Sequence, residues 1–400
     1  MNKLANLVSV ALAVSMALAL AAVTTSCASD DADASAAPTG PIDRTVTLAP
    51  PTNGYQLVTA PYEVPPLTEI ELCSVVRLEP KGDERYAWVN RFESMTSKGS
   101  HHMNVLIGKF SFLDGYLGRG ASEAALGTKL GQVPCKQLKL MESAFPVFPS
   151  QRQNQQIEMP KGVAIPMTTP LVLVFSHHFV NYEQVPVVFN AALNVETVDA
   201  AEVEQVAGLI FDGATVDVPV GTRTISQRTC VFERDVNVGL VSTHTHAWTE
   251  CATLHRVQAA VAGPTVEAAP FYVNRAWDQP PIVHFQPGTF AVKAGDGVHF
   301  ACHYLNNTER TLINDGTAEG EMCVFAAVVY PLAWTVPQVT EVLASGQLDK
   351  LIGFMGEALG GCDAVRDDLA SPWPKGSRPI EGSTSTCKGL PQTESNLLYP

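Results

Sequence analysis

The sequence predicts an all-β protein with two domains. Short apolar, β-branched runs bounded by Gly, Pro, Asn and Asp recur at the spacing typical of β-sandwiches and barrels. Helical periodicity is scarce before residues 336–359, where Gly360-Gly361 ends the predicted helix. The clearest predicted strands are residues 70–78, 103–107, 170–175, 187–195, 238–241, 257–261 and 324–330.

Composition bounds the function. The 400 residues are 46% hydrophobic and 16% charged, which is enough apolar material for two globular domains. The formal charge is −14, with 40 acidic and 26 basic residues and no basic run, so we expect no nucleic-acid partner. No GxxxxGK[ST] motif or strand-linked GxGxxG motif is present, which excludes the simplest nucleotide-binding sites.

Residues 1–26 have the pattern of an export signal. Lys3 is the only charge, and the apolar run 4–23 ends in small residues before Cys27. This end resembles a bacterial lipobox, although Thr24 stands where Leu is usual. A lipid on Cys27 would anchor the chain to the membrane in the bacterial cell envelope, facing the periplasm or exterior. Plain secretion and an uncleaved membrane anchor are the alternatives.

Shifts in composition suggest the domain boundaries. Residues 27–65 are rich in Asp, Ala, Ser, Thr and Pro, which predicts a flexible tether. Residues 212–223 are interpreted as a hinge, so the two β-domains are predicted at 66–220 and 225–345. Residues 346–400 are expected to hold the rest of the helix and a cysteine-stapled tail.

The cysteines are typical of disulfide staples. There are nine, and a lipidated Cys27 would leave an even eight in an oxidising compartment. None has CxxC spacing, which argues against a zinc ribbon or a thioredoxin-type site. Eight cysteines allow 105 pairings, so counting does not give the connectivity.

Two histidine pairs lie at the ends of predicted strands. His101-His102 follows Gly99-Ser100, and His177-His178 follows the apolar run 170–175. Adjacent side chains on a strand point to opposite faces, so such a pair shares one ion only where the strand starts or bends. Each pair alone fits a packing or surface role as well as a ligand role.

His244-Thr245-His246 is a stronger signal. Residues i and i+2 on a strand lie on one face, so two imidazoles stand side by side as half of a metal site. Met322 lies just before the strand 324–330, where a methionine more often fills a core. The other histidines are interpreted as packed or hydrogen-bonded.

Taken in order, these motifs resemble the copper type II, ascorbate-dependent monooxygenases, the family of dopamine β-monooxygenase and peptidylglycine α-hydroxylating monooxygenase. The resemblance runs from about residue 66 to 335. It is carried by Leu72-Cys73, His101-His102-Met103, His178-Phe179, Cys230, His244-Thr245-His246, Cys302, Glu321-Met322-Cys323 and Tyr330-Pro331.

The resemblance implies two tandem jelly-roll-like antiparallel β-sandwiches, each holding one copper ion. The first ion, an electron store, would be bound by His101, His102 and His178; His178 is preferred to His177 because an aromatic residue follows it. The second ion, which reacts with dioxygen, would take three further ligands. These are His244, His246 and Met322. The resemblance also implies a Cys302–Cys323 disulfide, which would bring His303 near Met322. His177 is a candidate to support the first site.

The chemistry of the donors agrees with copper. A thioether is a soft ligand suited to Cu(I), and a blue-copper site would need a thiolate that the even cysteine count does not leave. Ser242, Val324 and Ala326 replace the Arg, Asn and Tyr that hold the peptide in the amidating branch. A carboxylate-ended peptide is therefore not the expected substrate, and the pocket beside the second copper should be more apolar.

The sequence thus predicts a copper-dependent monooxygenase. It would hydroxylate a C–H bond of a small substrate with dioxygen and an external reductant such as ascorbate. The alternative is a lipid-anchored copper-binding or electron-transfer protein without oxygenase activity, and a structural β-sandwich is the third interpretation. No protein partner is evident.

Overall fold

The computed structural model describes most of residues 40–345 and parts of the C-terminal segment. The described ranges are 40–78, 86–108, 130–135, 144–168, 171–260, 264–314, 320–345, 376–379, 387, 389–394 and 398–399. The predicted export signal, Cys27 and the helix beyond residue 345 lie outside them. Residues 40–400 form one unit, and no helix described in it is long and apolar enough to span a membrane.

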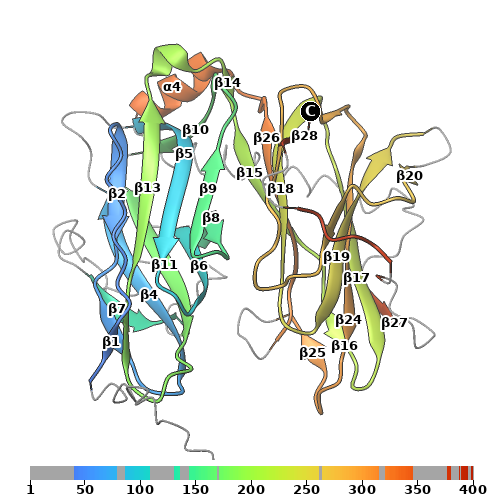
Figure 1. Cartoon of the computed structure of the whole chain (residues 1–400). Coiled ribbons are helices and arrows are strands. Elements are labelled where there is room, and N and C mark those ends of the chain that lie inside the picture. Colours follow the sequence, from blue (N-terminus) through green and yellow to red (C-terminus); the bar gives the residue numbers. More distant parts are fainter. Residues whose placement is uncertain are drawn as a thin grey trace, which may run out of the picture. The chain divides into compact units, whose positions relative to one another are not determined.

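Two sheets and a small third one are built from residues 42–206 (Figure 1). The first sheet contains β2 (Gly54–Val58), β13 (Ala191–Val198), β5 (Tyr86–Thr96), β10 (Val163–Thr168), β14 (Gln205–Val206) and β9 (Asn154–Glu158), of which β9 pairs with β5. The second contains β7 (Leu130–Pro134), β4 (Glu69–Leu78), β11 (Leu171–Val180), β6 (Ser100–Gly108) and β8 (Ala144–Ser150). The third contains β1 (Ile42–Asp43), β12 (Val187–Phe189) and β3 (Tyr62–Val64).

The first two sheets pack face to face as a sandwich. Alternate residues of each strand point to one face, and those on the inner faces form one buried cluster. Leu57, Phe92 and Leu193 enter it from one sheet, and Val105 and Phe175 enter it from the other.

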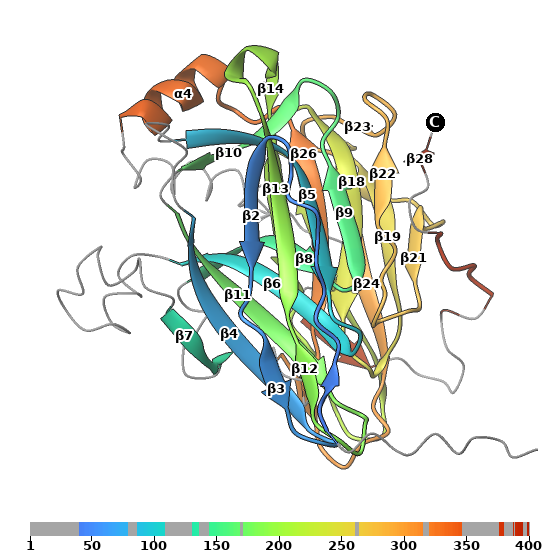
Figure 2. The ribbon, with the colours of Figure 1, turned by 60° about the vertical axis from the view of Figure 1, so that its left-hand side comes forward.

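A second sandwich is built from residues 208–399 (Figure 2). One sheet contains β15 (Gly208–Gly213), β26 (Cys323–Tyr330), β18 (Val236–Thr245), β22 (Val283–Phe285), β28 (Leu398–Tyr399) and β23 (Ala291–Val292). The other contains β20 (Thr265–Val266), β19 (Thr249–Gln258), β24 (Gly297–Leu305), β17 (Arg223–Val231), β27 (Gly376–Pro379) and β21 (Tyr272–Asn274). A separate pair contains β16 (Asp217–Val218) and β25 (Leu312–Ile313).

The strands β18 and β26 contribute residues from their opposite faces to the buried clusters of both sandwiches. Val241 and Val329 lie in the core of the second sandwich with Phe300 and Phe325, whose rings stack 5.8 Å apart. Leu240, next to Val241, belongs to the buried cluster of the first sandwich. The two sandwiches therefore share an apolar contact.

The all-β prediction is confirmed, and the helices among the described residues are the short α-helix α4 (Val336–Ala344) and the 3₁₀ turn η2 (Ala200–Glu202). The sequence predicted a helix over 336–359; α4 ends at Ala344, and residues 346–375 lie outside the described part of the chain. Thr335 and Gln338 form a capping box at its start, and Val339 and Leu343 are its buried residues.

Two predicted segments overlap described strands. The tether predicted over 27–65 includes β2 and β3, whose alternating apolar residues are buried in the core of the first sandwich and in the cluster of the third sheet, respectively. The hinge predicted at 212–223 includes the last two residues of β15, all of β16 and the first residue of β17, and β15 pairs along its whole length with β26. The tail prediction over 346–400 also gains the two strands β27 and β28.

Candidate metal centre

His101, His102 and His178 meet at the adjoining ends of β6 and β11. His102 and His178 are direct register partners, and a β-bulge follows His178. Gly99, just before β6, has a φ of +104°, and a Cβ there would approach the Phe189 ring to 3.0 Å. The strand start and the bulge let the neighbouring His101 and His102 turn toward one partner, so that one ligand atom from each histidine lies within 4.8 Å of the others.

Hydrogen bonds fix the nitrogen that His178 offers. Its Nε2 lies 2.6 Å from Oε1 of Glu69, so the Nε2–H donates to the carboxylate and Nδ1 carries a lone pair. That Nδ1 faces Nδ1 of His101 at 3.0 Å. His177 lies apart from this set, because its Nε2 contacts the hydroxyl of Ser100 at 2.8 Å.

His101 and His102 are neutral at physiological pH. Burial, followed by the nearby His178 and His246, lowers the pKa of His101 to about 3. Burial also places the pKa of His102 well below its usual value, with smaller contributions from the surrounding histidines. Nε2 of His101 and Nδ1 of His102 are buried without a hydrogen-bond partner among the described residues. Neutral imidazole nitrogens with unused lone pairs are the form that binds a metal ion.

His244 and His246 lie at the end of β18, with ring centroids 5.1 Å apart. Nδ1 of His246 donates to the carbonyl oxygen of Gly320 at 2.9 Å, so its Nε2 carries the lone pair. Thr245 pairs with Cys323 of β26 and both side chains are buried. The pairing of β18 with β26 ends at this position, and Met322 directly precedes Cys323 in the chain.

Glu321 joins the turn after His246 to the start of β26. Its side chain is fully buried, and its two oxygens accept from the backbone N–H groups of His246 at 3.0 Å and Trp248 at 2.7 Å, and from the Thr249 hydroxyl at 3.3 Å. Burial raises its pKa to about 7, and these hydrogen bonds oppose the shift. Glu321 thereby keeps the backbone of His246 close to the backbone of Met322.

The two histidine sets are in contact. The ring centroids of His102 and His244 are 5.9 Å apart, and electrostatic coupling to His246 reaches both His101 and His102. The structure therefore brings the five predicted histidine ligands into one cluster between the two sandwiches.

The segment between β21 and β22 covers one side of this cluster. The Trp277 ring lies 4.6 Å from the His101 ring. The backbone carbonyl oxygen of Trp277 accepts a hydrogen bond from Nε2 of Gln151 at 3.2 Å. The same segment is tied to its own sandwich, because the Ser242 hydroxyl donates to the Pro281 carbonyl at 2.9 Å. Trp277 thus contacts a histidine of the other sandwich from an anchored position.

Three disulfides are described: Cys73–Cys135, Cys251–Cys387 and Cys302–Cys323. Cys230 is disulfide-bonded as well. The Cys302–Cys323 bond joins β24 to the first residue of β26, immediately after Met322. It therefore fixes the backbone next to the predicted methionine ligand.

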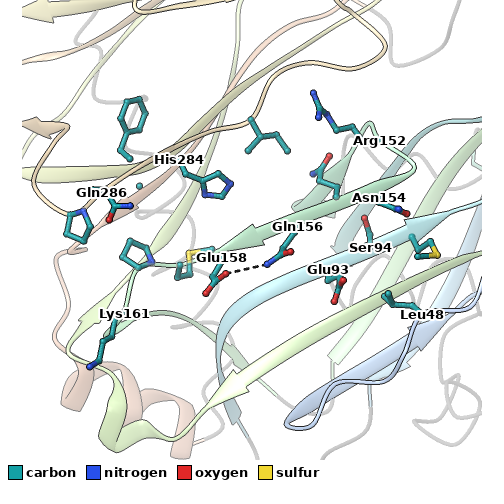
Figure 3. A pocket seen from close by; sticks show the side chains of 18 residues that line it. Leu48, Glu93, Ser94, Arg152, Asn154, Gln156, Glu158, Lys161, His284 and Gln286 are labelled. Carbon is teal, nitrogen blue, oxygen red and sulfur yellow. Dashed lines mark hydrogen bonds between the residues drawn. The ribbon is translucent and has the colours of Figure 1, made fainter. Parts of the chain in front are cut away.

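A polar pocket of about 780 Å³ lies between β5 and β9 of one sandwich and β22 of the other (Figure 3). Glu93, Gln156, Glu158 and His284 point into it, and Gln156 donates to Glu158 at 3.3 Å. None of the five clustered histidines is among its lining residues. The pocket is thus a feature separate from the histidine cluster.

Sequence reasoning missed the residues that support the cluster. Glu69 and Trp277 lie far along the chain from the histidines that they contact, and neither belongs to a recognisable motif. Glu321 stands in the Glu-Met-Cys motif, yet its role depends on backbone N–H groups that no side-chain pattern reveals.

Comparisons with known proteins give no family. No family model matches the chain, and no curated protein matches it. Among solved structures, the chain is similar to one from the Sulfolobus turreted icosahedral virus, at 10% identity and a TM-score of 0.16, covering 68% of this chain and 61% of that one. It is also similar to one from infectious bursal disease virus Gt strain, at 12% identity and a TM-score of 0.15, covering 73% and 77%. Likenesses this weak carry no functional argument.

Proposed function

We propose that this chain is a copper-dependent monooxygenase that hydroxylates a C–H bond of a small substrate with dioxygen and an external reductant such as ascorbate. The observation that carries the proposal is the cluster of five histidines in which His102 of one sandwich meets His244 of the other, and burial places the pKa values of these two well below the usual range. Met322 directly precedes Cys323, the register partner of Thr245, and the resemblance to the copper type II family implies that it is the third ligand beside His244 and His246.

The donors fit copper. His101, His102 and His178 provide three imidazoles, a set that tolerates both Cu(I) and Cu(II). His244 and His246 add two imidazoles, and Met322 would add a thioether, which is a soft ligand for Cu(I) that zinc sites almost never use. When bound, copper would supply one-electron redox chemistry at the first set and reaction with dioxygen at the second.

The protein's own residues prepare both sets. The Glu69 carboxylate holds the tautomer of His178, and the Gly320 carbonyl holds that of His246. Glu321 and the Cys302–Cys323 disulfide fix the strand that carries Met322. The Trp277 ring packs edge-on against the His101 ring. With copper held by both sets, the contact between His102 and His244 would provide a short path between them.

The test is oxygen uptake by copper-loaded protein with ascorbate and a panel of small apolar substrates, followed by mass spectrometry with isotopically labelled dioxygen. We expect one labelled oxygen atom in a product and loss of this product in His246→Ala. Reversible copper reduction without a labelled product would favour the electron-transfer alternative. Failure to bind copper would leave only a structural sandwich.

A further inference from the structure

We propose that Cys251, His303 and Cys387 form a second metal site, for a soft cation such as Cu(I), which becomes available when the Cys251–Cys387 disulfide is reduced. One ligand atom from each residue lies within 4.8 Å of the others. Cys251 of β19 and His303 of β24 are direct register partners, and Cys387 reaches them from the C-terminal segment. This site does not depend on the histidine cluster.

The ligand set is specific to this disulfide. Among the three disulfides with both halves described, only Cys251–Cys387 forms a metal-ligand group with a histidine or carboxylate. Two thiolates and one imidazole are donors that favour thiophilic ions, Cu(I) above all. Both cysteines are buried, with 0% and 1% of their surfaces exposed, so a bound ion would be protected from water.

The site forms in two steps, reduction of the Cys251–Cys387 disulfide and binding of Cu(I). A dithiol reductant gives two electrons and two protons to the Cys251–Cys387 bond, which becomes two thiols while the reductant becomes a disulfide. Cu(I) then displaces both thiol protons and binds the two sulfurs, and an imidazole nitrogen of His303 completes three-coordination. In the oxidised protein the sulfurs are bonded to each other, so they are not available as thiolates.

The donors stay together without the disulfide because other bonds hold the C-terminal segment. The Thr393 N–H donates to the Val273 carbonyl at 2.9 Å, and the Thr393 hydroxyl accepts from the Val273 N–H at 2.8 Å. The Arg275 guanidinium donates to the carbonyl of Cys387 itself. Reduction therefore leaves Cys387 beside Cys251 and His303.

The experiment counts metal in the full chain. The oxidised protein is first saturated with Cu(I) anaerobically, which gives the number of ions bound at all other sites. Protein reduced with a dithiol should bind one additional Cu(I), and X-ray absorption should gain a copper–sulfur contribution. His303→Ala, which keeps the disulfide, should weaken the additional ion at least ~10-fold.

A matched pair of double variants locates the ion. The change Cys251→Ser with Cys387→Ser should abolish the additional ion, whereas Cys73→Ser with Cys135→Ser should keep it. If reduction adds no ion while circular dichroism shows an intact fold, the bond is a structural staple only and the proposal is wrong. An additional ion that is indifferent to His303→Ala overturns it equally, even if the double cysteine variant fails to fold.

Discussion

The imidazole rings of His102 and His244 lie 5.9 Å apart although they belong to different sandwiches. No strand pairing links β6 to β18, so this contact depends on the packing between the sandwiches rather than on either sandwich alone. The two predicted copper sets therefore occupy one compartment, and each can influence the ion bound by the other.

We expect two copper ions per chain. His178→Ala should remove one of them and His246→Ala the other, because each variant loses a ligand from a different set. His284→Ala is the control, since His284 lines the polar pocket. Elemental analysis after dialysis measures the stoichiometry. A single copper ion in the wild type would contradict the assignment of two sets.

Glu69→Gln should weaken copper binding at the first set by ~10- to 100-fold, because the carboxylate that orients His178 is lost. Glu71→Gln is the matched control: Glu71 accepts from the Ser176 hydroxyl and is not bonded to a cluster histidine. Competition with a copper chelator gives the affinities. Equal effects of the two variants would show that Glu69 has no orienting role.

Met322→Ile tests the thioether. The change keeps apolar volume, so the stability of the fold should fall by less than about 1.5 kcal/mol. Cu(I) binding at the His244/His246 set should weaken. The copper–sulfur contribution to X-ray absorption, measured on Cu(I)-loaded protein with its disulfides intact, should disappear. Full product formation by the variant, or no sulfur contribution in the wild type, would return Met322 to a packing role.

The metal-free protein should lose stability as the pH falls below about 6.5. Burial lowers the pKa of His101 to about 3 and the pKa values of His102, His177 and His244 well below the usual range, so the unfolded chain binds protons that the folded chain does not. Each group contributes up to about 1.4 kcal/mol per pH unit between its unfolded and folded pKa.

Glu321 has the opposite sign. Its pKa is raised to about 7, so its contribution is present at low pH and is lost as the pH rises toward that value. Its contribution to the pH dependence of stability offsets that of about one of the four histidines. Urea unfolding between pH 8 and pH 5 measures the net slope, and His244→Gln should reduce it by one proton. A flat profile would show that the histidines are accessible to water.

The sequence pattern predicted the all-β class because strand periodicity and turn residues are local signals. It also singled out His101, His102, His178, His244 and His246, which the structure brings together. The strands near residues 54–64 escaped prediction because their alternating apolar residues are few and stand among Pro and Thr. The supporting contacts of Glu69 and Trp277 escaped it because register and packing between remote segments create them.

The C-terminal strands have a further consequence. β27 is the last strand of one sheet of the second sandwich, and β28 is the last strand of the other. Without them, β17 and β22 would each present unpaired N–H and C=O groups, which are templates for pairing with another molecule. A shortened chain that ends after α4 would keep all six predicted copper ligands. It would also have two unpaired strand edges that can pair with another molecule. We therefore expect the shortened chain to self-associate although its copper ligands are intact.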